Sequence, residues 1–191
     1  HAPGVHLDGL LMPLQPPGIP SFPARYPALV ADFNTWIKDP FGFLVAPPVL
    51  RVRLASAQAI SSGTWTILQF AAVDDDTYSG WVTTGSSPNY RYVPQAPGWY
   101  LVTLRVAANA AAGGTTHALM PGIYVTGMRY EGNESWQVTS DTAGQVSTQQ
   151  LVYLVPGVDY VQGAIVILSA ALNTPSTSGQ QCLMDINWVS A

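Results

Sequence analysis

The sequence predicts an all-β sandwich, and three observations support this fold class. From Val49 onward, apolar and polar residues alternate with a period of two, and clusters of Gly, Pro, Asn and Asp separate the alternating runs. The same region contains no amphipathic helical pattern. About eight short strands at near-regular spacing, joined by such turns, are typical of an all-β sandwich. With 191 residues, the chain is long enough for one domain with a substantial core.

A proline-rich segment precedes the sandwich, and we expect residues 1–48 to form an extended N-terminal arm. Ten of the 16 prolines fall there. Each proline removes a hydrogen-bond donor and restrains the preceding residue, so this segment is predicted to be extended. A disordered linker is the alternative, but linkers usually carry more charge or more Gly and Ser. We therefore predict an anchoring arm that docks onto another protein through Leu10, Leu11, Leu14, Ile19, Phe22 and Tyr26.

One short helix is expected within the arm, over about residues 28–39. The segment "ALVADFNTWIKD" places Leu29, Phe33, Trp36 and Ile37 on a single apolar stripe. A proline near the start favours the helix, and Pro40 is expected to end it. Because about three helical turns are not stable alone, Phe33 and Trp36 are expected to pack on the following domain or on a partner.

Residues 49–191 form the predicted sandwich, and the alternation assigns faces to its strands. "YLVTLRV" is predicted to bury one row and "CLMDINWV" a second: Tyr100, Val102, Leu104 and Val106, then Met184, Ile186 and Trp188. "WTILQF" and "DYVQGAIVIL" continue the strand pattern. The single cysteine, Cys182, lies in one of these runs and is predicted to be a small core residue.

The corner "QAPGWY" precedes the strand that begins with an inward Tyr100. Gly98 is expected to turn the chain sharply after Pro97, because glycine tolerates a positive φ. The alternation then directs Trp99 to the other face. There it would pack against a neighbouring subunit or the N-terminal helix, or else fill core space.

Charge is sparse, which limits the classes of partner. Only 9% of residues are charged, against roughly 25% in an ordinary soluble domain. A secreted β-protein and a subunit covered by copies of itself or by neighbours both fit, and we favour the subunit. The seven basic residues are scattered singly, so no nucleic-acid partner is expected. No stretch approaches the ~20 apolar residues of a membrane-spanning helix, so no membrane partner is expected.

No catalytic, metal or cofactor site is predicted, so we expect the protein not to be an enzyme. The run Asp74–Asp76 would bring three carboxylates to one loop, but it lacks the ligand spacing of a calcium loop. Its alternative is a solvated turn whose side chains cap backbone donors. The histidines and three further acidic residues form no recognisable catalytic set: His1, His6, His117, Glu131, Glu134 and Asp141.

The order of several motifs resembles the C1q/TNF-like jelly roll over about residues 50–191. The resemblance lies in "SAQAISSGTWTILQFAAVDDDTYSGWV", "PQAPGWYLVTLRVAA", "LVYLVPGVDYVQGAIVIL" and "CLMDINWVS". The matching positions are Trp65, Trp81, Gly98, Trp99, Tyr100, Leu154, Pro156, Gly157, Asp159, Val161, Ile186 and Trp188. The chain departs from the family pattern by Val158, which is inserted between Gly157 and Asp159.

The preamble "FNTWIKDPFGFLVAPPVLRVR" is similar to the lead-in of C1q-like proteins from tailed bacteriophages. This resemblance implies a virion component that assembles as a homotrimer in a minor-tail, fibre or capsid-decorating position. The candidate trimer-interface residues are Tyr90, Tyr92 and Trp99.

The leading functional hypothesis is a structural virion protein, whose arm docks onto other capsid or tail proteins while the trimeric jelly roll projects from the particle. The alternative is an adhesin at the tail tip that recognises a glycan or protein on the host surface. Aromatic and polar residues in loops 83–95, 126–141 and 172–181 would suit sugar binding.

Overall fold

The computed structural model describes residues 39–84, 88–109, 117–130, 137–139, 144–168, 172–174 and 181–191. The chain divides between Val45 and Ala46, so that Ala46–Ala191 forms one unit. The sequence placed this division three residues later, after residue 48. The predicted anchoring residues lie outside the described residues: Leu10, Leu11, Leu14, Ile19, Phe22, Tyr26, Phe33 and Trp36.

The described helix, α2 (Asp39–Val45), differs from the sequence prediction. Pro40 was expected to end a helix over residues 28–39, whose residues before Asp39 lie outside the described part of the chain. Instead, Pro40 is the second residue of α2. Proline is tolerated there because the first-turn N–H groups have no partner within the helix. Pro40 therefore lies at the start of the described helix, and its predicted role in ending the preceding helix stays a prediction.

Strands dominate the rest of the described chain, as the alternation predicted. The first six strands are β1 (Val49–Arg53), β2 (Ala59–Ile60), β3 (Thr66–Ile67), β4 (Ala72–Asp76), β5 (Trp81–Val82) and β6 (Arg91–Tyr92). The next four are β7 (Gly98–Ala108), β8 (His117–Val125), β9 (Met128–Tyr130) and β10 (Gln137–Thr139). The last four are β11 (Gly144–Leu154), β12 (Val161–Leu168), β13 (Leu172–Asn173) and β14 (Leu183–Ser190). The all-β fold class is confirmed.

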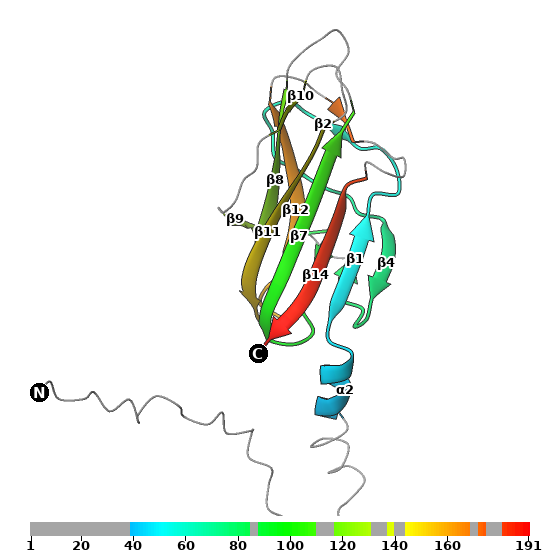
Figure 1. Ribbon diagram of the computed structural model, residues 1–191, viewed down its shortest axis with the longest axis vertical. Helices are drawn as coiled ribbons and strands as arrows, with labels where there is room; N and C mark the ends of the chain where they lie inside the picture. The colour runs from blue at the N-terminus through cyan, green and yellow to red at the C-terminus, as the bar shows by residue number, and fades with distance from the viewer. Residues whose placement is uncertain are drawn as a thin grey trace, which may run out of the picture. The chain divides into compact units, whose positions relative to one another are not determined.

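Two antiparallel sheets face each other (Figure 1). Among the described residues, one sheet has the strand order β11-β7-β14-β1-β4. The other has the order β10-β8-β12-β6-β5, with β3 also paired to β12 and β9 to β8. A short pair, β13-β2, completes the described pairing. Neighbours such as β7 and β14 are far apart in sequence, as expected for a jelly roll rather than a series of hairpins.

The core lies between the sheets and contains the rows that the sequence assigned to it. On β7, the inward side chains of Tyr100, Val102, Leu104 and Val106 are completely buried. On β14, Met184 and Ile186 are buried, and Trp188 packs partly against the core. This confirms the predicted faces of these two strands.

The turn between β11 and β12 accommodates the inserted Val158. Gly157 adopts a φ of 75°, and the N–H groups of Val158 and Asp159 both donate to the carbonyl of Val155, at 3.2 and 3.0 Å. The carboxylate of Asp159 in turn accepts from the Val155 N–H at 2.9 Å and from the Thr126 hydroxyl at 2.9 Å. The extra residue is therefore held in a closed turn tied to the end of β8.

Adjacent residues on β7 should differ sharply in their contribution to stability. Leu104→Ala removes a completely buried side chain, and we expect it to lower the free energy of unfolding by about 2–5 kcal/mol. Thr103→Ala is the matched control, because Thr103 faces outward and its hydroxyl accepts only one described hydrogen bond, from Gln149 at 3.1 Å. Its expected cost is at most about 1 kcal/mol. Denaturant unfolding of both variants measures the difference, and equal losses would contradict the assigned faces.

Cys182 should be inert in the folded chain. It is completely buried, which confirms its predicted core position, and its Sγ accepts a hydrogen bond from the Ala107 N–H at 3.2 Å. Burial is the main reason that the pKa of its thiol is raised to about 11. Since the thiolate is the reactive form, we expect no reaction with a disulfide reagent at pH 8 until denaturant is added. Rapid release of the reagent's coloured thiol on mixing with the native protein would refute this.

Candidate assembly face

The outward face of the five-stranded sheet gathers apolar side chains at one end. The β11–β7 register places Tyr153 opposite Trp99 and Leu151 opposite Leu101. Because neighbours in an antiparallel pair share a face, the four side chains form two adjacent cross-strand pairs on the outward side. We call this group, together with the rest of edge strand β11, the assembly face.

The side chains of the assembly face are unusually exposed for their size. Trp99, Leu151 and Tyr153 expose 41%, 51% and 47% of their surface. The rings of Trp99 and Tyr153 meet edge to face, with centroids 5.4 Å apart and planes at 73°. Val189, the extra residue at an irregularity in the β14–β7 pairing, is also half exposed. Large apolar groups that remain in water next to one another mark a surface suited to association.

Gly98 determines where this face begins. Its φ is 146°, which confirms the positive φ predicted at this corner. A Cβ at this position would lie 2.4 Å from the carbonyl oxygen of Ser190 and 2.5 Å from Nε1 of Trp188. Glycine therefore lets the start of β7 pack directly against the end of β14. From there, the alternation directs Trp99 outward and Tyr100 into the core.

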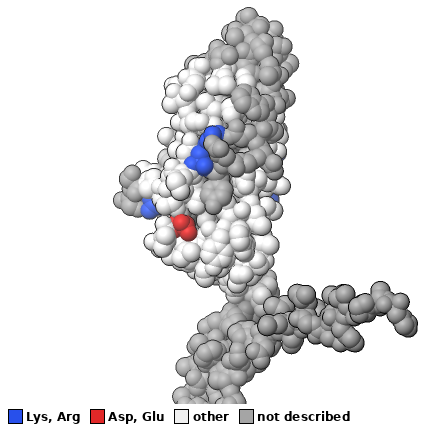
Figure 2. All heavy atoms as spheres, turned by 90° about the vertical axis from the view of Figure 1, so that its left-hand side faces the viewer, with Lys and Arg blue, Asp and Glu red and all other residues white. Residues whose placement is uncertain are grey.

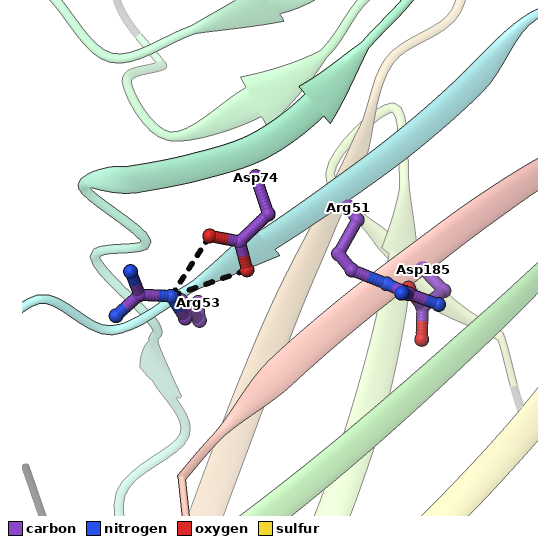
Figure 3. A network of polar contacts seen from close by, with 4 residues as sticks. All are labelled: Arg51, Arg53, Asp74 and Asp185. Carbon is purple, nitrogen blue, oxygen red and sulfur yellow. Dashed lines mark hydrogen bonds and ion pairs between the residues drawn. The ribbon is translucent and has the colours of Figure 1, made fainter. Parts of the chain in front are cut away.

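Charged side chains lie on the same outward face of this sheet but nearer its other edge, on β14, β1 and β4; Figure 3 shows four of them. Arg51 of β1 donates from Nε to Oδ1 of Asp185 on β14 at 2.6 Å. This hydrogen bond and the charge of Asp185 raise the pKa of Arg51 above its ordinary value. Arg53 donates to both carboxylate oxygens of Asp74 on β4, at 2.9 and 3.1 Å. Since these pairs are largely exposed, they contribute little to stability but keep this part of the face hydrated.

The two edge strands of the five-stranded sheet differ in how many charged residues they carry. Among the described strands, β4 forms one edge and carries Asp74, Asp75 and Asp76. The other edge is β11, whose 11 residues, "GQVSTQQLVYL", include no charged residue and no proline. Figure 2 views the molecule from the side on which β8, β9 and β11 lie in Figure 1, and its described surface is mostly uncharged. Charge and proline are the usual protection of an edge strand against pairing, and β11 has neither.

Arg105 is the charged residue on the outward side of β7. It faces Ser147 of β11 and Leu183 of β14 in the strand register. Its Nε is buried and has no hydrogen-bond partner among the described residues. A buried donor without an acceptor is costly, so the described residues leave this part of the sheet incompletely satisfied.

Of the predicted interface residues, Trp99 lies on the assembly face, whereas Tyr92 does not reach the surface. Tyr92 is 1% exposed and packs edge to face on Tyr100, with centroids 5.9 Å apart. Burial is the main reason that the pKa of each phenol is raised. The prediction for Tyr92 is corrected, because it fills the core of its own chain. Tyr90 lines a separate pocket with residues of two other segments.

Tyr153 and Leu151 were not identified from the sequence, although a signal was present. In the run from residue 144 to residue 154, the buried positions recur at Val146, Thr148, Val152 and Leu154. The same alternation places Leu151 and Tyr153 on the outward side. Their closeness to Trp99 follows from strand pairing across about 50 residues of sequence, which periodicity does not report.

The acidic run Asp74–Asp76 belongs to edge strand β4 rather than to a loop. The carboxylate of Asp76 accepts hydrogen bonds from the N–H groups of Gly80 and Trp81, both at 2.9 Å, so it caps the following turn. Within the described ranges, no group of three His, Cys, Asp or Glu residues is arranged to hold a metal ion. The only histidine in those ranges, His117, begins β8. No helix of the described part is long and apolar enough to span a membrane.

No known family model and no curated protein sequence matches the chain. Among solved structures, it is similar to murine APRIL at pH 8.0, with 14% identity over 73% of this chain and 98% of that chain and a TM-score of 0.50. PRD1 vertex protein P5 is similar at 14% identity over 75% and 97% of the two chains, with a TM-score of 0.46. Eiger TNF from S. frugiperda is similar at 10% identity over 75% and 95%, with a TM-score of 0.44. The similarity to APRIL confirms the TNF-like jelly-roll fold, while the two lower scores support no conclusion.

Substitution of Gly98 should lower the free energy of unfolding by more than the strain of a positive φ alone. Gly98→Ala is expected to cost about 1 kcal/mol for the backbone conformation and a further 1–3 kcal/mol for overlap with Ser190 and Trp188. Gly157→Ala is the matched control, because Gly157 also has a positive φ but no atom lies within 4 Å of its Cβ position. Denaturant unfolding compares the two, and a loss at Gly98 no larger than at Gly157 would show that the close approach is unimportant.

Proposed function

We propose that this chain is a non-enzymatic structural subunit of a tailed-phage particle, which assembles into a homotrimer through its assembly face. The N-terminal arm anchors the trimer to other particle proteins, and the jelly roll projects from the capsid or tail surface. In this trimer, other copies of the same chain cover the assembly face. The proposed role depends on burying surface between proteins, and it involves no making or breaking of covalent bonds.

The contrast between the two edges of the five-stranded sheet carries this proposal. The β4 edge is protected by three aspartates and by the Arg53–Asp74 ion pair. The β11 edge is long, uncharged and adjacent to the exposed pair of Trp99 and Tyr153. A protein that remained a monomer would need protection at both edges. Covering β11 with another copy of the chain supplies the missing protection.

The energetics require a broad contact. Burying the exposed half of each large apolar side chain contributes about 1 kcal/mol. Association costs roughly 4–15 kcal/mol, so the aromatic end alone is insufficient and the length of β11 must take part.

The proposed role in a virion is supported by features of the sequence, in addition to the geometry of the assembly face. The arm of residues 1–48 holds ten of the 16 prolines, and the whole chain has only 9% charged residues. Both suit a subunit whose surfaces are covered in an assembly. The preamble around residues 33–53 is similar to the lead-in of C1q-like phage proteins. Immunogold labelling of purified particles tests this role, and a purified particle without the chain would overturn it.

Light scattering of the purified full chain tests the assembly. We expect a mass three times the 20.4 kDa of one chain. Leu151→Lys places a charge on the assembly face without touching the core, so it should shift the mass towards that of one chain. Met128→Lys is the control, because Met128 is 73% exposed on the other sheet and should leave the mass unchanged.

The outcomes separate the parts of this proposal. A wild-type mass of one or two chains would overturn the trimer. A trimer that survives Leu151→Lys would show that trimerisation uses a different surface. Loss of the trimer with Met128→Lys as well would mean that an added charge disrupts it regardless of position.

A further inference from the structure

A pocket of about 320 Å³ lies beside Tyr90, away from the assembly face. Its lining comes from the segment that runs from Leu54, after β1, to Ala59 at the start of β2, from Gln69 and Ala71 between β3 and β4, and from Tyr90 before β6. None of these residues belongs to β7, β11 or β14. The volume falls at the lower end of the range of roughly 300–1,000 Å³ that is usual for small-molecule sites.

The wall of this pocket is held rigidly by Gln58. Its side-chain amide donates to the carbonyl of Ile67 at 2.9 Å, and its amide oxygen accepts from the Gln69 N–H at 3.0 Å. The backbone of Gln58 exchanges hydrogen bonds with Thr174, a completely buried residue. Both functional groups of the Gln58 side chain are thus used to position the segment that carries Gln69.

Tyr90 is held in a conformation that its own side chain disfavours. Its φ is 52°, a left-handed value that is an outlier for a bulky residue. Among the described residues, Ser79 and Thr126 are the two other non-glycine residues with a positive φ, and neither has an aromatic side chain. Strain of this kind persists only when surrounding contacts impose it, and it is concentrated at functional sites.

Two side chains hold the backbone just before Tyr90. Gln162, a polar residue that is 5% exposed on β12, donates from Nε2 to the carbonyl of Asn89 at 2.8 Å. Arg91 donates from its guanidinium to the carbonyl of Pro88. A buried glutamine is thus used to hold the backbone immediately before a strained tyrosine at the pocket.

The polar groups of the lining are neutral and available. Within the described part of the chain, the side chains of Ser56, Gln69 and Tyr90 make no hydrogen bond, ion pair or ring contact. The remaining lining is small and apolar, with Ala57, Ala59 and Ala71. The pocket therefore offers one aromatic ring, several hydroxyl and amide groups, and no charge.

From this combination we infer that the pocket binds a neutral sugar, with a single pyranose ring stacked on Tyr90 and its hydroxyl groups hydrogen-bonded by Gln69 and Ser56. A pyranose presents an apolar C–H face and a rim of hydroxyls, which match an aromatic ring beside amide and hydroxyl groups. A charged sugar would find no ionic partner in this lining, and desolvating its charge would be costly. The inference goes beyond the proposed structural role and does not depend on it.

Saturation-transfer NMR with the full wild-type chain tests the inference. The probes are the methyl glycosides of glucose, galactose and N-acetylglucosamine, and rhamnose, with N-acetylneuraminic acid as the charged comparison. For a single ring, a Kd in about the millimolar range is expected. We expect saturation transfer to at least one neutral sugar and much less to the acid.

Tyr90→Gly separates a binding role from a structural one. Glycine relieves the positive φ but removes the ring, so the melting temperature should stay equal or rise while saturation transfer is lost. Tyr124→Ala is the matched control, because Tyr124 lies on β8, where its ring contacts Trp65, and it does not line this pocket. That variant should retain sugar binding.

Three results would overturn the inference. The first is the absence of saturation transfer to every neutral probe. The second is transfer that survives Tyr90→Gly or is lost only in Tyr124→Ala. The third is a Tyr90→Gly chain that melts well below the wild type, because Tyr90 would then be a packing residue. Light scattering of the same samples reports the oligomeric mass, so a failure of assembly is distinguished from a failure of binding.

Discussion

The rest of the structure depends on how the inward row of β7 packs between the two sheets. Leu104 approaches β12 so closely that a Cβ at Gly163 would lie 2.9 Å from its methyl group, and Phe70 would lie 3.0 Å away. Strand side chains alternate, so a buried Tyr100–Val106 row requires that Trp99 and Leu101 face outward. The assembly face is therefore a consequence of the core register.

The sheet protects its two edges by different physical means. At β4, ion pairs and the aspartate run make pairing with another strand unfavourable, because charges would lose their water. At β11, the outward row runs from Gln145 to Tyr153 without a charge, which leaves covering by protein as the means of protection. In the proposed trimer, this asymmetry gives a direction to assembly, since the charged edge would remain in solvent while the uncharged edge would be buried.

The proposed assembly face and the proposed sugar pocket share no residue. The first is built on β7, β11 and β14, and the second on the segments that precede β2, β4 and β6. One chain can therefore use both at once. An oligomer would present several copies of a weak pocket, and binding to a surface that displays many sugars would gain from the raised effective concentration. The proposed structural role and the proposed sugar binding are therefore compatible in one small domain.

Short-range pattern in the sequence determined the all-β class, the buried rows around Leu104 and Ile186, the core position of Cys182 and the positive φ of Gly98. These follow from the period of two and from the conformational freedom of glycine, which act within a few residues. Tertiary structure alone decided that Tyr92 is buried, that Tyr153 meets Trp99, that Pro40 lies inside a helix, and that Tyr90 borders a pocket made from separate segments. Alternation reports which residues share a face, but not which strand lies alongside or what covers that face, because pairing joins residues that are far apart in the chain.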